Sequence, residues 1–136
     1  MSNAKPSVAA LQGRRVLVVE DEYFIADDVR KALRTLGAEV VGPVPTREEA
    51  LAILSSDQEI HLAVLDINLQ DQMVYPVADA LRGRDVPFVF ATGYDAGSVA
   101  EGYLDVPRWE KPFDPDKLAG ALAGLRPTRR STGKVQ

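Results

Sequence analysis

Short apolar runs alternate with segments of helical periodicity along most of the chain. The apolar runs contain many β-branched and aromatic side chains, which favour strands. The predicted strands are 16–19, 39–42, 61–65, 88–91 and a short one around 108–109. We expect Pro43 to end the second strand, because proline cannot donate a hydrogen bond within a sheet.

The segments between the strands place apolar residues three or four positions apart, as amphipathic helices do. Helices are predicted over 23–36, from 46 to about 54, over 76–82 and from about 114 to 125. The hydroxyl of Thr46 can accept a hydrogen bond from the backbone of Glu49, so Thr46 is the expected cap of the second helix. In the last helix the apolar stripe consists of Leu118, Ala121, Leu122 and Leu125. Segment 95–102 contains two glycines, and we expect a helix there to be short, shifted or mobile.

Alternating strands and helices, with strands apolar on both faces, predict a parallel sheet covered by helices on both sides. The expected fold is α/β: a flavodoxin-like, doubly wound (βα)5 sheet with strand order 2-1-3-4-5. The domain is expected over 13–125, after an N-terminal extension at 1–12. Residues 126–136 form a basic tail that we expect to be disordered.

Composition narrows the classes of function. The chain has 136 residues, a net charge of -4, no cysteine and one histidine, His61. Without cysteine it has no thiolate zinc site and no disulfides. Its negative net charge does not favour a nucleic-acid-binding domain. No apolar run is long enough to cross a membrane and no signal peptide is evident, so we expect a cytoplasmic protein.

Polar residues occur where the predicted strands end. Glu20 and Asp21 follow the first strand, Asp66 the third, Thr92 the fourth and Lys111 the fifth. The carboxyl ends of parallel strands meet at one edge of a sheet, and with order 2-1-3-4-5 the first and third strands are neighbours. Carboxylates gathered in this way require a cation, and hard oxygen ligands favour Mg²⁺.

These residue types suit phosphoryl transfer to a carboxylate. An aspartate can act as a covalent nucleophile towards phosphorus. Lys111 would provide a fixed positive charge, and Thr92 a hydrogen-bond donor, for the phosphoryl oxygens. Glu22, the third acid of the first cluster, is interpreted as a solvated residue at a helix start.

The ordered set of motifs resembles the receiver domain of two-component response regulators over about residues 13–125. The motifs are Glu20-Asp21, Asp66, Thr92 and Lys111-Pro112-Phe113. The stretches YPVADAL at 75–81 and PFVFATGY at 87–94 are similar to a stand-alone bacterial subclass with a Phe-Ala-Thr-Gly signature.

The resemblance implies a role for each matched residue. Asp66 would accept a phosphoryl group from the phosphohistidine of a sensor kinase. Asp21 would bind Mg²⁺ directly, Glu20 mainly through water, and Asn68 through its backbone carbonyl together with Asp66. Thr92 and Lys111 would contact the phosphoryl group.

The same resemblance implies that the Lys111–Pro112 peptide is cis and that the kinase is a histidine kinase, similar to the HWE type. The downstream protein is unknown, and homodimer formation is left open. The protein would then be a phosphoacceptor switch, not an enzyme with external substrates.

The chain departs from the family at one position. Many receivers have a tyrosine or phenylalanine three residues before the lysine, where this chain has Arg108. Trp109 is one residue later and therefore faces the opposite side of its strand. Tyr94, two residues after Thr92, is the expected substitute.

Two other functions fit parts of the pattern. A small Mg²⁺-dependent phosphatase would also use an aspartyl nucleophile with a threonine and a lysine, but it needs a general acid where this chain has Asn68. A flavin-binding module of the same topology needs a phosphate-cradling loop after the first strand, and EDEYF carries the wrong charge.

Overall fold

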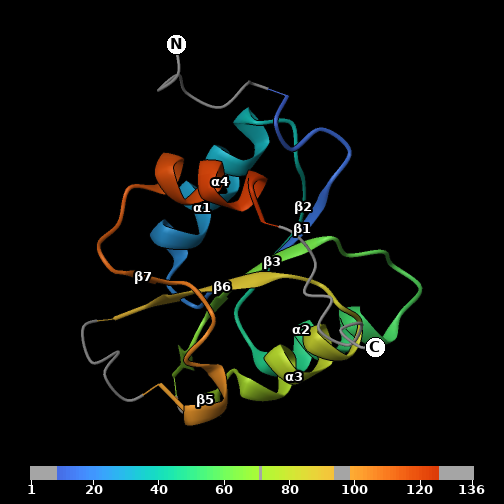
Figure 1. The fold of residues 1–136 in the computed structure, drawn as a ribbon, viewed down its shortest axis with the longest axis vertical. Coiled ribbons are helices and arrows are strands. Elements are labelled where there is room, and N and C mark those ends of the chain that lie inside the picture. The colour runs from blue at the N-terminus through green and yellow to red at the C-terminus, as the bar shows by residue number, and fades with distance from the viewer. Residues whose placement is uncertain (1–8, 71, 94–98, 126–136) are drawn as a thin grey trace, which may run out of the picture.

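Five parallel strands form the central sheet, in the order β2-β1-β3-β6-β7 (Figure 1). The computed structural model describes residues 9–70, 72–93 and 99–125. The sheet strands are β1 (Arg15–Val19), β2 (Glu39–Val44), β3 (Leu62–Asp66), β6 (Phe88–Thr92) and β7 (Arg108–Glu110). Counting these strands along the chain gives the predicted order 2-1-3-4-5, so the predicted topology is confirmed.

Helices cover both faces of the sheet. They are α1 (Tyr23–Thr35), α2 (Arg47–Ser55), α3 (Tyr75–Gly83), the 3-10 helix η2 (Glu101–Tyr103) and α4 (Pro115–Ala123). Helices α1 and α4 pack together on one face and α2 and α3 on the other (Figure 1). The predicted cap of α2 is confirmed, because Thr46 Oγ1 accepts a hydrogen bond from the Glu49 backbone nitrogen at 3.1 Å.

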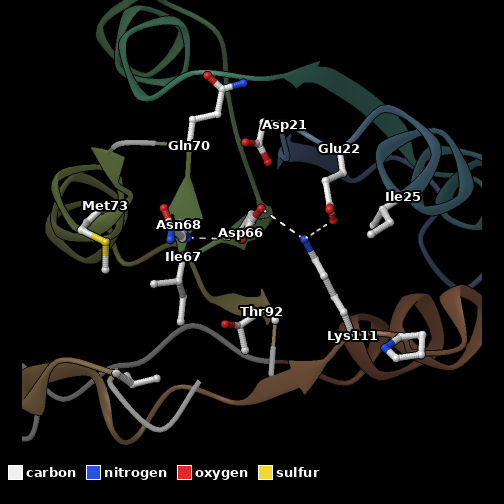
Figure 2. Close-up of a pocket in the computed structure, with 13 residues that line it drawn as sticks. Asp21, Glu22, Ile25, Asp66, Ile67, Asn68, Gln70, Met73, Thr92 and Lys111 are labelled. Atoms are coloured by element: carbon white, nitrogen blue, oxygen red, sulfur yellow. Dashed lines mark hydrogen bonds and ion pairs between the residues drawn. The ribbon is translucent and has the colours of Figure 1, made fainter. Parts of the chain in front are cut away.

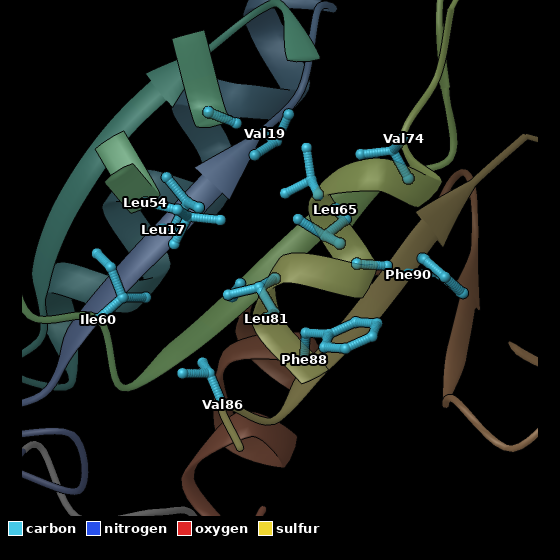
Figure 3. Packing of buried hydrophobic residues seen from close by; sticks show 14 of the residues in the cluster. Leu17, Val19, Leu54, Ile60, Leu65, Val74, Leu81, Val86, Phe88 and Phe90 are labelled. Atoms are coloured by element: carbon cyan, nitrogen blue, oxygen red, sulfur yellow. The ribbon is translucent and has the colours of Figure 1, made fainter. Parts of the chain in front are cut away.

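Each face of the sheet has its own apolar core. Beneath α2 and α3, strand residues such as Leu17, Leu65 and Phe90 pack against Leu54 and Leu81 (Figure 3). The other core lies beneath α1 and α4 and includes the fully buried Leu11, Leu33, Leu118 and Leu122. Ala121 was placed on the buried stripe of the last helix, but it is exposed, and Ala119 is buried instead.

The prediction that Pro43 ends the second strand is wrong. The strand continues to Val44, and its register with β1 shifts between Leu17 and Val19. Gly42 makes this irregularity feasible, with a φ of +97°. A Cβ at Gly42 would lie 2.8 Å from the Val44 nitrogen and 2.9 Å from the Val18 oxygen, so only glycine fits.

The loop after β3 contains a short antiparallel hairpin where a plain polar loop was expected. Its strands are β4 (Asn68–Leu69) and β5 (Gln72–Met73). Helix α2 holds the hairpin through Arg47 Nη1, which donates to the Met73 carbonyl at 3.1 Å. Gln72 Nε2 also donates to Glu48 Oε2 at 2.9 Å. The periodicity of apolar residues does not predict this hairpin, because the hairpin depends on contacts with α2.

The segment predicted as a weak helix, 95–102, is described from residue 99 and contains the start of η2. Aromatic contacts hold η2 against α3. The ring of Tyr75, at the start of α3, stacks on Tyr103 with centroids 4.8 Å apart. The Tyr75 hydroxyl accepts a hydrogen bond from the Ala100 backbone nitrogen at 2.9 Å. Both tyrosine rings also meet Phe90 of β6 edge to face. The segment is therefore tied to a helix and to the strand that ends at Thr92.

Polar contacts from the next turns of α3 complete this attachment. The Arg82 guanidinium lies 4.8 Å from the Tyr103 ring centroid and donates to the Gly102 carbonyl at 2.9 Å and to Asp105 Oδ1 at 2.7 Å. The Tyr103 hydroxyl donates to Asp79 Oδ1. Tyr75, Asp79 and Arg82 thus form one stripe at helical spacing, which we call the α3 stripe.

Replacing Arg82 with alanine should loosen this segment without unfolding the domain. The change removes a cation–π contact and two hydrogen bonds that are partly open to solvent. We expect the amides of 102–106 to exchange with solvent about two- to ten-fold faster, as the loss of such contacts allows. Hydrogen exchange followed by NMR measures this effect. Arg84→Ala, an exposed change just after α3, is the matched control, and equal exchange in both variants would contradict the assigned role of Arg82.

Candidate phosphoacceptor and metal site

The carboxyl ends of β1 and β3 bring three acids together. The two strands are hydrogen-bonded neighbours, with Val19 opposite Leu65, so the residues that follow them lie side by side. One carboxylate oxygen from each of Glu20, Asp21 and Asp66 lies within 4.8 Å of the others. This is the juxtaposition that the strand order predicted.

Backbone contacts fix the first of these acids. The Glu20 nitrogen donates to the Val44 carbonyl at 3.0 Å, which extends the pairing of β1 with β2 beyond the end of β1. Glu20 Oε2 in turn accepts a hydrogen bond from the Glu22 nitrogen at 3.0 Å. The side chain of Glu20 is 3% exposed, so its direction is set by these contacts and not by solvent.

Thr92 and Lys111 come from the neighbouring strand ends. Thr92 is the last residue of β6 and is buried, and its carbonyl accepts a hydrogen bond from the Lys111 nitrogen at 2.7 Å. Among the described residues, the buried polar or charged ones are Glu20, Asp66 and Thr92. The Lys111–Pro112 peptide is cis, which confirms the expectation drawn from the family resemblance.

The Lys111 ammonium is surrounded by carboxylates. Figure 2 shows its side chain extending towards Asp66 and Glu22. Its Nζ atom lies 3.1 Å from Glu20, 2.9 Å from Glu22 and 3.2 Å from Asp66. The Lys111 side chain is 13% exposed, and its ion pairs with Glu20 and Asp66 are largely shielded from water, whereas Glu22 is open to solvent.

A cavity of about 670 Å³ opens in front of these groups (Figure 2). Asp66, Thr92 and Lys111 line its polar side. Its apolar lining consists of Ile25, Ile67, Met73, Val99 and Pro112. The volume is sufficient for a phosphoryl group together with a hydrated ion.

Burial and a neighbouring acid disfavour the charged form of Asp66. Removal from water is the larger cause, and the adjacent Glu20 carboxylate adds to it. Lys111 acts in the opposite direction, but the pKa of Asp66 is still raised from 3.8 to about 8. Burial acts to lower the pKa of Lys111, but the carboxylates of Glu22, Asp66 and Glu20 outweigh it and raise that pKa, so the ammonium stays charged. The site therefore has an excess of negative charge that a cation would relieve.

The donor set fits Mg²⁺. All three clustered ligand atoms are carboxylate oxygens, the hard donors that this ion prefers, and they converge beside a cavity that can hold its remaining waters. The main chain of Asn68 is also close, since its nitrogen donates to Asp66 Oδ1 at 3.3 Å.

The structure brings together the five side chains singled out by the sequence: Glu20, Asp21, Asp66, Thr92 and Lys111. Glu22 is the N-cap residue of α1 and its side chain is 58% exposed, as predicted for a solvated helix start. Its carboxylate also makes the shortest contact to Lys111, which the sequence does not predict. The cluster of three successive acids is the only signal of this contact in the sequence, because the partner is 89 positions away.

The strand that precedes Lys111 has the predicted orientation. Arg108 is exposed, whereas Trp109 faces the α1–α4 core and meets the Phe113 ring edge to face at 6.5 Å. Trp109 is therefore a packing residue. Tyr94, the expected substitute for the usual aromatic residue, lies outside the described residues.

Comparison with known proteins gives a consistent result. The family described as response regulator receiver domain matches residues 16–123. The phyllosphere-induced regulator PhyR of Methylorubrum extorquens is 31% identical over 131 residues, which cover 90% of this chain and 47% of PhyR. The chain spans about half the length of the curated relatives it matches.

Solved structures are also similar. The solution structure of SdrG from Sphingomonas melonis Fr1 is 44% identical, with a TM-score of 0.72, over 84% of this chain and 95% of SdrG. The BeF3-activated conformation of SdrG, given as from Pseudomonas melonis Fr1, is 41% identical, with a TM-score of 0.67, over 90% of this chain and 97% of that one. This chain belongs to the response regulator receiver domain family.

Proposed function

We propose that Asp66 is the phosphoacceptor of this receiver domain. The observation that carries the proposal is a buried carboxylate, on a side chain 6% exposed, that lines a cavity beside two further acids, an ammonium and a threonine. A buried carboxylate in a cavity that can bind a cation is typical of a reactive group, whereas a carboxylate without such a role is usually exposed to water.

The proposed reaction moves a phosphoryl group from a phosphohistidine to Asp66. The nitrogen–phosphorus bond breaks, a bond forms between phosphorus and an Asp66 carboxylate oxygen, and the imidazole keeps the electron pair. Lys111 would pair with the phosphoryl oxygens, and the Thr92 hydroxyl would donate to one of them. Glu20, Asp21, Asp66 and the Asn68 carbonyl would hold Mg²⁺, which when bound offsets the charge of the phosphoryl oxygens.

The implied phosphodonor is a sensor histidine kinase, and we propose one similar to the HWE type. We further propose that this receiver acts on a separate downstream protein, either alone or as a homodimer, since this chain covers 95% of the solved SdrG chain, which is therefore of similar extent. No helix in the described ranges has the length and apolar character needed to cross a membrane. We place the protein in the cytoplasm, where such kinases present their phosphohistidine.

The signal would leave through the region 93–113. Its described part contacts β6 through the Phe90–Tyr103 ring pair, with centroids 6.1 Å apart, and Phe90 is two residues before Thr92 on the same strand. A shift of Thr92 towards a phosphoryl group would therefore strain the packing between this strand and the segment that the α3 stripe holds.

The alternative of a small aspartyl-nucleophile phosphatase is less well supported. Such an enzyme needs an acid two residues after its nucleophile, and Asn68 cannot donate that proton. We propose that the protein promotes only its own phosphorylation and dephosphorylation. Turnover of a generic phosphomonoester would favour the phosphatase instead.

A small phosphodonor such as acetyl phosphate, with Mg²⁺, should label the protein once. Intact mass spectrometry should show a single phosphoryl addition in the wild type and none in Asp66→Asn, which lacks the acceptor carboxylate. Asp57→Asn, an exposed change between α2 and β3, is the control and should label normally. Unchanged labelling of Asp66→Asn would mean that another residue is the acceptor.

Replacing Asp21 with asparagine should weaken Mg²⁺ binding by at least about ten-fold, because one anionic ligand is lost. Calorimetric titration measures this directly. Trp109 fluorescence provides a second readout, since Trp109 is two residues from Lys111 along the chain. Equal affinities of Asp21→Asn and wild type would exclude Asp21 as a ligand.

The raised pKa of Asp66 predicts a pH-dependent difference in stability. Without metal, the folded state holds a proton on Asp66 up to about pH 8, whereas the unfolded state loses it near 3.8. Between these values the folded state binds more protons, so the contribution of Asp66 to stability declines as pH rises. Asp66→Asn carries no such charge. Its free energy of unfolding should therefore exceed that of wild type by an amount that grows with pH to the order of 1–3 kcal/mol at pH 8.

Chemical denaturation in EDTA at pH 5 and pH 8 tests this difference, and added Mg²⁺ should reduce it. A constant difference between the two pH values would show that Asp66 titrates normally in the folded protein.

A further inference from the structure

The three hydrogen-bond donors of the Lys111 ammonium are matched by three carboxylates. Its Nζ donates to Glu20 Oε2 at 3.1 Å, to Glu22 Oε1 at 2.9 Å and to Asp66 Oδ2 at 3.2 Å. A lysine ammonium has three N–H groups and no more. An incoming phosphoryl group can therefore pair with Lys111 only if one of these contacts is given up.

The three carboxylates differ in how easily each can break its contact with Lys111. The side chains of Glu20 and Asp66 are 3% and 6% exposed, whereas that of Glu22 is 58% exposed. Glu20 is fixed by its own hydrogen bonds, and Asp66 is the proposed acceptor and must stay. Glu22 can turn into water at little cost, because its carboxylate would be hydrated there.

The position of Glu22 in α1 also indicates a special role. Glu22 is the N-cap residue of α1, a position where a side chain usually accepts a hydrogen bond from the first turn of the helix. Its side chain makes no such bond. The carboxylate turns instead across the site to Lys111 (Figure 2), so the helix start presents a charge to the lysine.

We propose that Glu22 is a positioning residue that occupies Lys111 until a phosphoryl group displaces it. This inference rests on the proposed function of Asp66 and adds a competitor for the same lysine. In the unphosphorylated state Glu22 holds the ammonium beside Asp66. In the phosphorylated state its place on Nζ passes to a phosphoryl oxygen, and Glu22 turns to solvent. Glu22 therefore sets how readily the phosphorylated state forms.

The expected size of the effect follows from exposure. An ion pair with one partner largely in solvent changes an equilibrium by a small factor. Removing the competitor should tighten the binding of a phosphoryl mimic by about two- to five-fold, with Lys111 still in place to receive it.

The test uses beryllofluoride as the phosphoryl mimic, with Mg²⁺ saturating for each variant as established by separate titration. The affinity is measured by ¹⁹F NMR of the bound mimic in wild type, Glu22→Gln and Glu22→Ala. Asp28→Asn is the matched control, because it removes one negative charge from an exposed position on the same helix. Thermal unfolding of each variant shows that the proteins compared are folded.

We expect both Glu22 variants to bind the mimic more tightly than wild type, while Asp28→Asn matches wild type. Unchanged or weaker binding by the Glu22 variants would overturn the inference, and so would an equal gain in Asp28→Asn, which would indicate a general charge effect. If wild type itself does not bind the mimic, the proposed function fails, and this outcome is distinct from a failure of the role of Glu22.

Discussion

The ammonium of Lys111 compensates a group of carboxylates that would repel one another at the edge of the sheet. Two of these side chains, Glu20 and Asp66, are almost completely removed from water, where an unpaired charge costs several kcal/mol. One lysine does not balance this charge, since burial and Glu20 still raise the pKa of Asp66 to about 8. The remaining imbalance gives the site its tendency to bind a cation and makes its chemistry dependent on one.

The rest of the fold fixes the places of these charges. Parallel pairing of β1 with β3, of β3 with β6 and of β6 with β7 brings four strand ends to the same edge. Two apolar cores, one on each face, keep the sheet rigid between the helices. The aromatic cluster formed by α3, β6 and η2 lies on the face that α2 and α3 cover, whereas the Trp109–Phe113 pair lies on the other face. A change at Thr92 would therefore act mainly on the face that α2 and α3 cover.

Most of the architecture could be predicted because it depends on local patterns. Contiguous apolar strands, helical periodicity and polar residues at strand ends are visible without tertiary contacts, and they gave the strand order and five site residues. The pattern of apolar and polar residues did not predict features that depend on contacts between residues far apart in the sequence. The contact of Glu22 with Lys111, the hairpin held by Arg47 and the α3 stripe all join residues 20 or more positions apart. The continuation of β2 past Pro43 depends on Gly42, whose positive φ the alternation of apolar residues does not reveal.

The irregular end of β2 has a consequence for how this sequence can change in length. The register shift between Leu17 and Val19 pairs Val44, instead of Pro43, with Val19, and the next backbone nitrogen along the chain, that of Glu20, can then donate to the Val44 carbonyl. Deleting a residue between Val41 and Val44 would remove that alignment and leave the backbone of Glu20 without its anchor. Homologous chains that keep an acid at this position should therefore tolerate insertions after Val44, in the approach to α2, but not within the last residues of the strand.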